Sequence, residues 1–122
     1  MEIPQSALMA GAMAILAMAA FFIVSSAPGD YDSMAKCMAS KGVKMYGAVW
    51  CSHCNEEKKM FGTSWKYMNY VECSVDGGRE EAQICKDAGI IAYPTWEFAD
   101  GAKLAWVFTL DELSAKTGCP LK

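Results

Sequence analysis

The chain has 122 residues, of which 53% are hydrophobic and 20% are charged, and its formal net charge is -3. This length allows one small domain and excludes a multidomain enzyme. The acidic balance and the lack of a Lys/Arg cluster argue against nucleic acid as a partner, because phosphate backbones are bound mainly through positive charge. The apolar surplus instead indicates a membrane segment.

This surplus lies at the N-terminal end. Residues 7–24 are an unbroken apolar run, and no charge occurs between Glu2 and Asp30. About 17 to 25 such residues span a bilayer as a helix. A cleaved signal peptide is the alternative, but no Lys or Arg precedes the run, and the run is longer than a usual signal-peptide core. The sequence therefore predicts a retained single-span anchor over 1–28 and one domain over 29–122.

Four helices are predicted in the domain, and a glycine follows each of them closely, as is common at helix ends. Their ranges are 32–41, 54–61, 79–88 and 110–117. The last helix has the clearest start, because Thr109 and Glu112 have the spacing of a capping box.

Four strands are predicted between these helices. Residues 43–50 and 68–74 are β-prone apolar runs. Residues 94–99 and 102–108 form a hairpin around Asp100-Gly101, a pair typical of the two-residue type I′ turn. The resulting order of α, β, α, β, α, β, β, α indicates an α/β domain.

The chemistry is predicted at Cys51 and Cys54, which lie at the junction of a predicted buried strand and a helix. Cys51 is expected at the helix N-terminus, where the macrodipole and free amides stabilise a thiolate, so it is the candidate nucleophile. Cys54 is the candidate resolving thiol, which attacks a mixed disulfide. His53 is the single histidine of the chain, and we expect it to favour the Cys51 thiolate through charge or a hydrogen bond.

Half of a zinc site is the alternative interpretation of this motif. A zinc ribbon needs a second closely spaced cysteine pair, whereas Cys73 and Cys85 fall on different predicted elements. We therefore expect no metal and no other cofactor.

Tyr93-Pro94-Thr95 forms the second part of the predicted site. Proline at the first position of a strand is in some cases only an edge residue. Together with the cysteine motif, this proline resembles the cis-proline loop of the thioredoxin superfamily. A cis bond exposes the backbone of Tyr93 to an added substrate strand, so Trp50, Tyr93 and Thr95 are predicted to contact substrate.

Four segments carry a closer resemblance. Residues 45–62, 70–73, 84–86 and 93–97 resemble the thioredoxin-like domains fused to, or working beside, prokaryotic vitamin K epoxide reductase (VKOR) homologues. In that family the domain passes disulfides between secreted substrates and a membrane VKOR partner that hands electrons to quinone.

The resemblance implies a thioredoxin-like fold, with a central mixed sheet flanked by helices, after the single N-terminal transmembrane helix. It also implies that Cys51 and Cys54 are the redox pair, that Pro94 is the cis-proline, and that Cys73 and Cys85 form a structural disulfide. Because this chain has one predicted span, a VKOR partner would be a separate polypeptide.

Two positions depart from related patterns. Ser52 stands where the family commonly has proline, so the redox potential of a Cys-Pro-His-Cys motif does not carry over. Met45 stands where cytosolic thioredoxins have a buried aspartate, so a proton acceptor for Cys54 is missing at that position. The second departure argues against a general reductant.

Two further features of the domain are the cysteines at its ends and a short charged run. Cys37 and Cys119 flank the domain and either form a disulfide or remain buried thiols, and the sequence leaves both options open. The charged run at residues 56–59 is interpreted as a solvated helix face.

The predicted function is a membrane-anchored thiol/disulfide oxidoreductase, with protein thiols and disulfides as substrates. The positive-inside rule would place Lys36, Lys41 and Lys44 in the cytoplasm, but the cysteine chemistry favours the extracytoplasmic side of the cell membrane. The alternatives are a tethered reductant, for example in cytochrome maturation, and a non-catalytic module that binds metal or peptide.

Overall fold

The computed structural model of the chain describes residues 29–122. The predicted anchor, residues 1–28, lies outside these described residues. Within 29–122, none of the helices has both the length and the apolar character of a membrane span.

The described residues form four α-helices, one 3-10 helix and four strands, in the predicted order of elements with one addition. The addition is a 3-10 helix directly after the helix that carries the cysteine motif. The elements are α2 (Asp32–Ser40), β1 (Lys44–Gly47), α3 (Ser52–Phe61), η1 (Gly62–Tyr67), β2 (Asn69–Glu72), α4 (Gln83–Asp87), β3 (Thr95–Glu97), β4 (Lys103–Leu104) and α5 (Leu110–Thr117).

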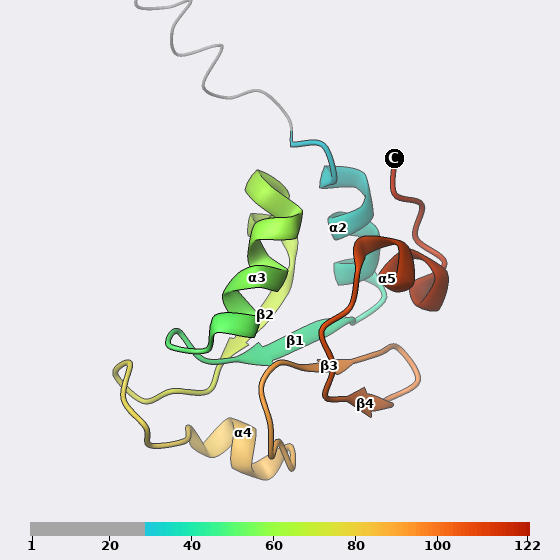
Figure 1. The fold of residues 1–122 in the computed structure, drawn as a ribbon. Coiled ribbons are helices and arrows are strands. Elements are labelled where there is room, and N and C mark those ends of the chain that lie inside the picture. The colour runs from blue at the N-terminus through green and yellow to red at the C-terminus, as the bar shows by residue number, and fades with distance from the viewer. Residues whose placement is uncertain (1–28) are drawn as a thin grey trace, which may run out of the picture.

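The four strands form one mixed sheet in the order β2-β1-β3-β4. β1 pairs with β2 in parallel, and β3 is antiparallel to both β1 and β4. In Figure 1, α2, α3 and α5 lie on one side of this sheet and α4 lies on the other. A parallel β-α-β unit joined to a β-hairpin and a final helix fits the predicted thioredoxin-like fold.

A hydrophobic cluster lies on each face of the sheet because side chains alternate along a strand. Met45 enters the larger cluster, under α2, α3 and α5, together with Phe61 and Trp96. Tyr46, the next residue, enters the smaller cluster on the α4 side. Both faces of the sheet are therefore covered, one by α2, α3 and α5 and the other by α4 (Figure 1).

Two disulfides connect distant parts of the domain. Cys73 at the end of β2 is bonded to Cys85 in α4, which is the pair that the family resemblance implied. Cys37 in α2 is bonded to Cys119 after α5, at a sequence separation of 82. The structure therefore selects the bonded option for the pair that the sequence had left open.

The predicted helix over residues 79–88 is too long at its N-terminal end. α4 begins only at Gln83, because the preceding backbone pairs with the end of β2. Ser74 and Glu81 form an antiparallel bridge, and the Ala82 amide donates to the Cys73 carbonyl at 2.7 Å. Hydrogen bonds to a neighbouring segment thus replace the first turn of the expected helix.

The predicted hairpin exists, but its turn and length differ from the prediction. The Gly101 amide donates to the Phe98 carbonyl, and Phe98 also pairs with Ala102, so the loop has three residues instead of two. Gly101 has a φ of 84°, whereas Asp100 does not have the positive φ that a type I′ turn requires. This geometry is the common three-residue hairpin with a glycine bulge.

The second hairpin strand contains only Lys103–Leu104, not residues 102–108. In the observed register Trp96 lies opposite Leu104, so Pro94 would lie opposite position 106. Proline has no N–H to donate to a further rung of the ladder. The chain after Leu104 therefore leaves the sheet and runs toward α5.

The start of α5 agrees with the prediction. The Thr109 hydroxyl oxygen accepts from the Glu112 amide, and the Glu112 carboxylate accepts from the Thr109 amide, each at 3.1 Å. Gly118 ends the helix in the left-handed region with a φ of 73°.

Candidate functional site

Cys51 and Cys54 lie at the start of α3, after the short turn at residues 48–50. β1 ends at Gly47, so the predicted strand over 43–50 is too long at its C-terminal end. Cys51 is the N-cap residue, and its sulfur accepts a hydrogen bond from the Cys54 amide at 3.2 Å. The Cys51 amide in turn donates to the Ala48 carbonyl at 3.0 Å, which closes the turn between strand and helix. Both cysteines are free thiols in this structure.

The two thiols differ in access to solvent. Cys51 is 8% exposed, whereas Cys54 is fully buried. Burial, together with the hydrogen bond to the Cys51 side chain, raises the pKa of Cys54 to about 12. Cys54 is therefore a protonated, inaccessible thiol at neutral pH, and Cys51 is the sulfur that an external group can reach.

His53 lies on the exposed side of α3. Its side chain is 65% exposed, and its Nδ1 lies 3.4 Å from a carboxylate oxygen of Glu56. Within residues 29–122, Glu56 is the hydrogen-bond partner found for this ring. The predicted effect of His53 on the Cys51 thiolate remains a prediction.

The loop before β3 lies against the cysteine motif. The Tyr93–Pro94 peptide bond is cis, as the sequence predicted. The ring of Tyr93 packs edge-on against Trp50, with 5.9 Å between the ring centroids. Thr95 is buried, and its hydroxyl donates to the Ala92 carbonyl at 2.7 Å, so its side chain supports the loop from inside.

A hollow of about 220 Å³ lies beside this loop. It is lined by His53, Ala92, Tyr93, Pro94, Ala105, Trp106 and Val107. Trp106 is 64% exposed, and the sequence analysis missed it because residues 102–108 were assigned to a strand. A large exposed aromatic side chain at a hollow beside the cis-proline loop is typical of a surface that binds other molecules.

Trp50 is held in place by the loop that follows β2. Its indole N–H donates to the Gly78 carbonyl at 2.9 Å, and the Arg79 guanidinium lies 4.3 Å from the ring centroid. Val49 and Ile91 add exposed apolar surface at the two chain segments that flank the site. The surroundings of Cys51 are thus apolar and partly aromatic.

Glu57 is a buried carboxylate that the sequence analysis assigned to a solvated face. It is fully buried, and one of its oxygens accepts from the Trp96 indole N–H and the Phe108 amide. Its other oxygen has no hydrogen-bond partner among the described residues. Burial raises the pKa of Glu57 to about 7. The interpretation of residues 56–59 is therefore wrong at this position, because α3 turns Glu57 toward β3.

Glu72, at the end of β2, holds the chain segment before the cysteine motif through hydrogen bonds. Nothing in the sequence signalled this role. Its carboxylate accepts from the Tyr70 hydroxyl at 2.6 Å, the Val49 amide at 3.0 Å and the Ser74 hydroxyl at 2.6 Å. Burial acts to raise the pKa of Glu72, but the hydrogen bonds from Ser74 and Tyr70 outweigh it and lower that pKa. The ionised carboxylate therefore fixes the chain two residues before Cys51.

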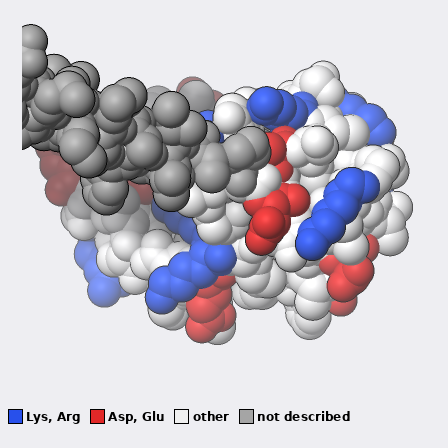
Figure 2. Space-filling model, turned by 90° about the horizontal axis from the view of Figure 1, so that it is seen from above, with Lys and Arg blue, Asp and Glu red and all other residues white. Residues whose placement is uncertain are grey.

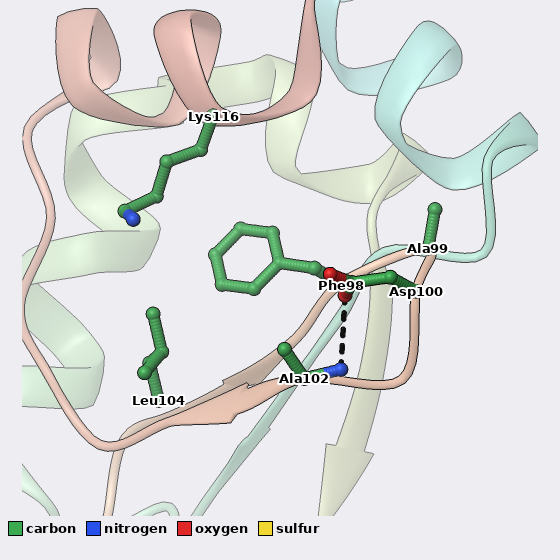
Figure 3. Close-up of a pocket in the computed structure, with 6 residues that line it drawn as sticks. All are labelled: Phe98, Ala99, Asp100, Ala102, Leu104 and Lys116. Carbon is green, nitrogen blue, oxygen red and sulfur yellow. Dashed lines mark hydrogen bonds between the residues drawn. The ribbon is translucent and has the colours of Figure 1, made fainter.

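A second hollow lies away from the cysteines, between the hairpin and α5 (Figure 3). Its volume is about 330 Å³, and its lining residues are Phe98, Ala99, Asp100, Ala102, Leu104 and Lys116. The Asp100 carboxylate accepts a hydrogen bond from the Ala102 amide at 3.0 Å. Neither cysteine of the motif lines this hollow.

Charge is evenly distributed over the part of the surface that Figure 2 shows. Positive and negative side chains alternate on this face, and no continuous patch of one sign forms there. In the described part of the chain, no group of three or more His, Cys, Asp or Glu residues is placed to hold a metal ion.

Comparison with known proteins finds similarity to a plant oxidoreductase. No family model matches the chain. The chain is 45% identical over 103 residues to the protein named thiol-disulfide oxidoreductase LTO1 from Arabidopsis thaliana. The alignment covers 80% of this chain and 27% of that protein, so the chain spans about a quarter of its relative. This similarity supports a thioredoxin-like redox domain.

Proposed function

We propose that the chain is a membrane-anchored thiol/disulfide oxidoreductase that exchanges disulfides with protein substrates through Cys51 and Cys54. The geometry of this pair carries the proposal, because Cys51 caps α3 near the surface and Cys54 lies buried one turn later. The name of the Arabidopsis relative gives independent support.

The exchange starts from the Cys51–Cys54 disulfide when the protein acts as an oxidant. A substrate thiolate attacks the accessible Cys51 sulfur, and Cys54 leaves as a thiolate and takes up a proton. A second substrate thiolate then attacks the substrate sulfur of the mixed disulfide and releases Cys51. The substrate loses two electrons and forms a disulfide, and the protein is left as a dithiol.

The surface beside Cys51 is suited to an extended peptide. The cis bond at Pro94 leaves the backbone of Tyr93 next to the motif, where a substrate can pair with it as an added strand. Trp50, which packs against Tyr93, and Trp106, which lines the hollow beside Pro94, provide exposed apolar contact surface. A site of this kind accepts many sequences, because backbone pairing supplies most of the contact.

We further propose that the dithiol is reoxidised by a VKOR-type membrane protein, and that the domain lies on the extracytoplasmic side of the cell membrane. The resemblance of residues 45–62 to VKOR-associated domains supports the partner. The two structural disulfides support the location, since such bonds persist in oxidising compartments.

Trapping and redox measurements test the activity. Cys54→Ser should accumulate mixed disulfides with disulfide-bonded protein substrates, because the Cys51 thiolate attacks the substrate disulfide and no second thiol resolves the product, whereas Cys51→Ser should not, because only Cys51 is accessible. An oxidant role requires a reduction potential near about -120 to -180 mV, and a value near about -270 mV would favour the tethered reductant. Trapping by Cys51→Ser alone would reverse the two roles.

The location and the partner need separate measurements. In intact cells, a membrane-impermeant thiol reagent should label Cys51 of the full chain after mild reduction. Cys54→Ser expressed together with a VKOR homologue should form a disulfide-linked complex with it. Labelling only after lysis would place the domain in the cytoplasm, and the absence of the complex would remove the proposed partner without affecting the exchange activity.

A further inference from the structure

A tyrosine from the neighbouring strand closes the space behind Cys54. In the parallel pairing of β1 and β2, Met45 lies opposite Tyr70 and Gly47 lies opposite Glu72. A Cβ atom on Gly47 would lie 3.0 Å from the Cys54 sulfur and 3.2 Å from the Tyr70 hydroxyl oxygen. The sulfur and the phenol therefore border the same small space, which is left open because residue 47 is glycine.

Lys58 covers the face of this tyrosine. It lies on α3 one helical turn after Cys54, and its Nζ is 3.9 Å from the centroid of the Tyr70 ring. The ring is fixed at its far end, because its hydroxyl donates to Glu72 at 2.6 Å. The cation–π contact thus holds the ammonium group of Lys58 against the ring that borders the same space as the buried Cys54 sulfur.

We propose that Lys58 is a positioning residue for disulfide exchange, whose ammonium group, held over the Tyr70 ring, stabilises the Cys54 thiolate when the mixed disulfide is resolved. The proposal rests on the proposed function, because it assigns a role in the same exchange reaction. Met45 stands where cytosolic thioredoxins have an acid that accepts the proton of the buried cysteine. In this domain the positive charge of Lys58 would instead favour the Cys54 thiolate directly.

The step in question begins with Cys51 joined to the sulfur of a partner. Cys54 loses its proton to solvent, and the resulting thiolate attacks the Cys51 sulfur. The Cys51–Cys54 bond forms, the bond between Cys51 and the partner breaks, and the partner leaves as a thiolate. The cysteine pair is oxidised by two electrons, which the partner receives.

Other groups facing Cys54 do not supply this positive charge. In the mixed disulfide Cys51 has no free thiol, so its hydrogen bond no longer raises the pKa of Cys54. Tyr70 on β2, backed by Glu72, and Tyr93 on the cis-proline loop are both neutral, because burial raises the pKa of each phenol. Burial raises the pKa of Cys54 and the charge of Lys58 acts in the opposite direction.

The reaction of the full chain with Ellman's reagent separates the two steps. After mild reduction that leaves the structural disulfides intact, Cys51 attacks the reagent in a first phase that depends on reagent concentration. Cys54 then displaces the bound thionitrobenzoate in a second phase that does not depend on it. Below the pKa of Cys54, the rate of this second phase follows the fraction of thiolate.

Lys58→Met should slow the second phase by about three- to tenfold at a fixed pH, which corresponds to a rise of about half to one unit in the pKa of Cys54. Its first phase should stay unchanged. Lys58→Arg should restore the second phase, because it keeps the charge. Lys59→Met is the matched control, since it removes the same charge from the next, exposed position of α3 and should change neither phase.

An unchanged second phase in Lys58→Met, or an equal slowing in Lys59→Met, would overturn the proposal. If Lys58→Met does not fold, Tyr70→Leu provides the second variant, because it removes the ring that holds the ammonium group. That variant should also slow the second phase, and an unchanged rate would again overturn the proposal. A native chain that releases no second thionitrobenzoate would instead refute the proposed function.

Discussion

The buried carboxylate of Glu57 should make the stability of the domain depend on pH. Burial raises its pKa from the ordinary value of 4.5 to about 7, although the Phe108 amide and the Trp96 indole donate to it. Above the folded-state pKa, the protein must keep an ionised group in its interior, with one oxygen lacking a partner among the described residues. The unfolded chain has no such cost, because water solvates the carboxylate.

Because the pKa of Glu57 is higher in the folded state than in the unfolded state, the domain is less stable at higher pH. Between about pH 4.5 and about pH 7, the folded state retains a proton that the unfolded state has lost, so the free energy of unfolding falls as pH rises. The total loss is about 3 kcal/mol at roughly 1.4 kcal/mol per pKa unit, an upper figure for a group that relaxes or gains a water molecule when it ionises.

Glu57→Gln removes this dependence and keeps an oxygen that accepts from Phe108. We expect the variant to match the native protein at about pH 5 and to exceed it by about 2 to 3 kcal/mol at about pH 8. Denaturant unfolding followed by tryptophan fluorescence measures both values. Glu56→Gln, the same change at an exposed neighbour, should alter the difference by less than about 1 kcal/mol. A native stability that is constant over this range, or a variant less stable than native at the higher pH, would refute the reasoning.

Three further outcomes follow from the structure. A small alkylating agent should modify Cys51 before Cys54 in the reduced chain, as mass mapping would show, because Cys54 is fully buried and its pKa is raised to about 12. Replacing both Cys37 and Cys119 with serine should lower the free energy of unfolding by about 4 to 5 kcal/mol, the chain-entropy value for so long a loop, and a loss below about 1 kcal/mol in denaturant titration would contradict this. His53→Ala should lower the reduction potential measured against glutathione, with about 30 mV for each tenfold change in the equilibrium constant, and an unchanged or higher potential would show that His53 does not tune the pair.

The sequence by itself determined the features that depend on neighbouring residues. The capping box at Thr109 needs only a correctly spaced Glu112, and the place of Cys51 as the N-cap of α3 needs only a helix that begins right after it. Such contacts span one helical turn, so a short stretch of sequence contains all the atoms involved. The cis bond at Pro94 was predicted in another way, from the resemblance of Tyr93-Pro94-Thr95, together with the cysteine motif, to the cis-proline loop of the thioredoxin superfamily.

The tertiary structure decided whatever depends on register and on contacts between distant segments. Glu57 stands in a charged run, and only the packing of α3 against β3 shows that it faces Trp96. The closure of the space behind Cys54 by Tyr70 depends on the pairing of β1 with β2. The disulfide between Cys37 and Cys119 likewise depends on where α2 and the end of the chain meet. The residues in each of these contacts are far apart in sequence. The local pattern of hydrophobic and charged residues is compatible with several strand registers and helix packings, so only the complete fold decides which residues meet.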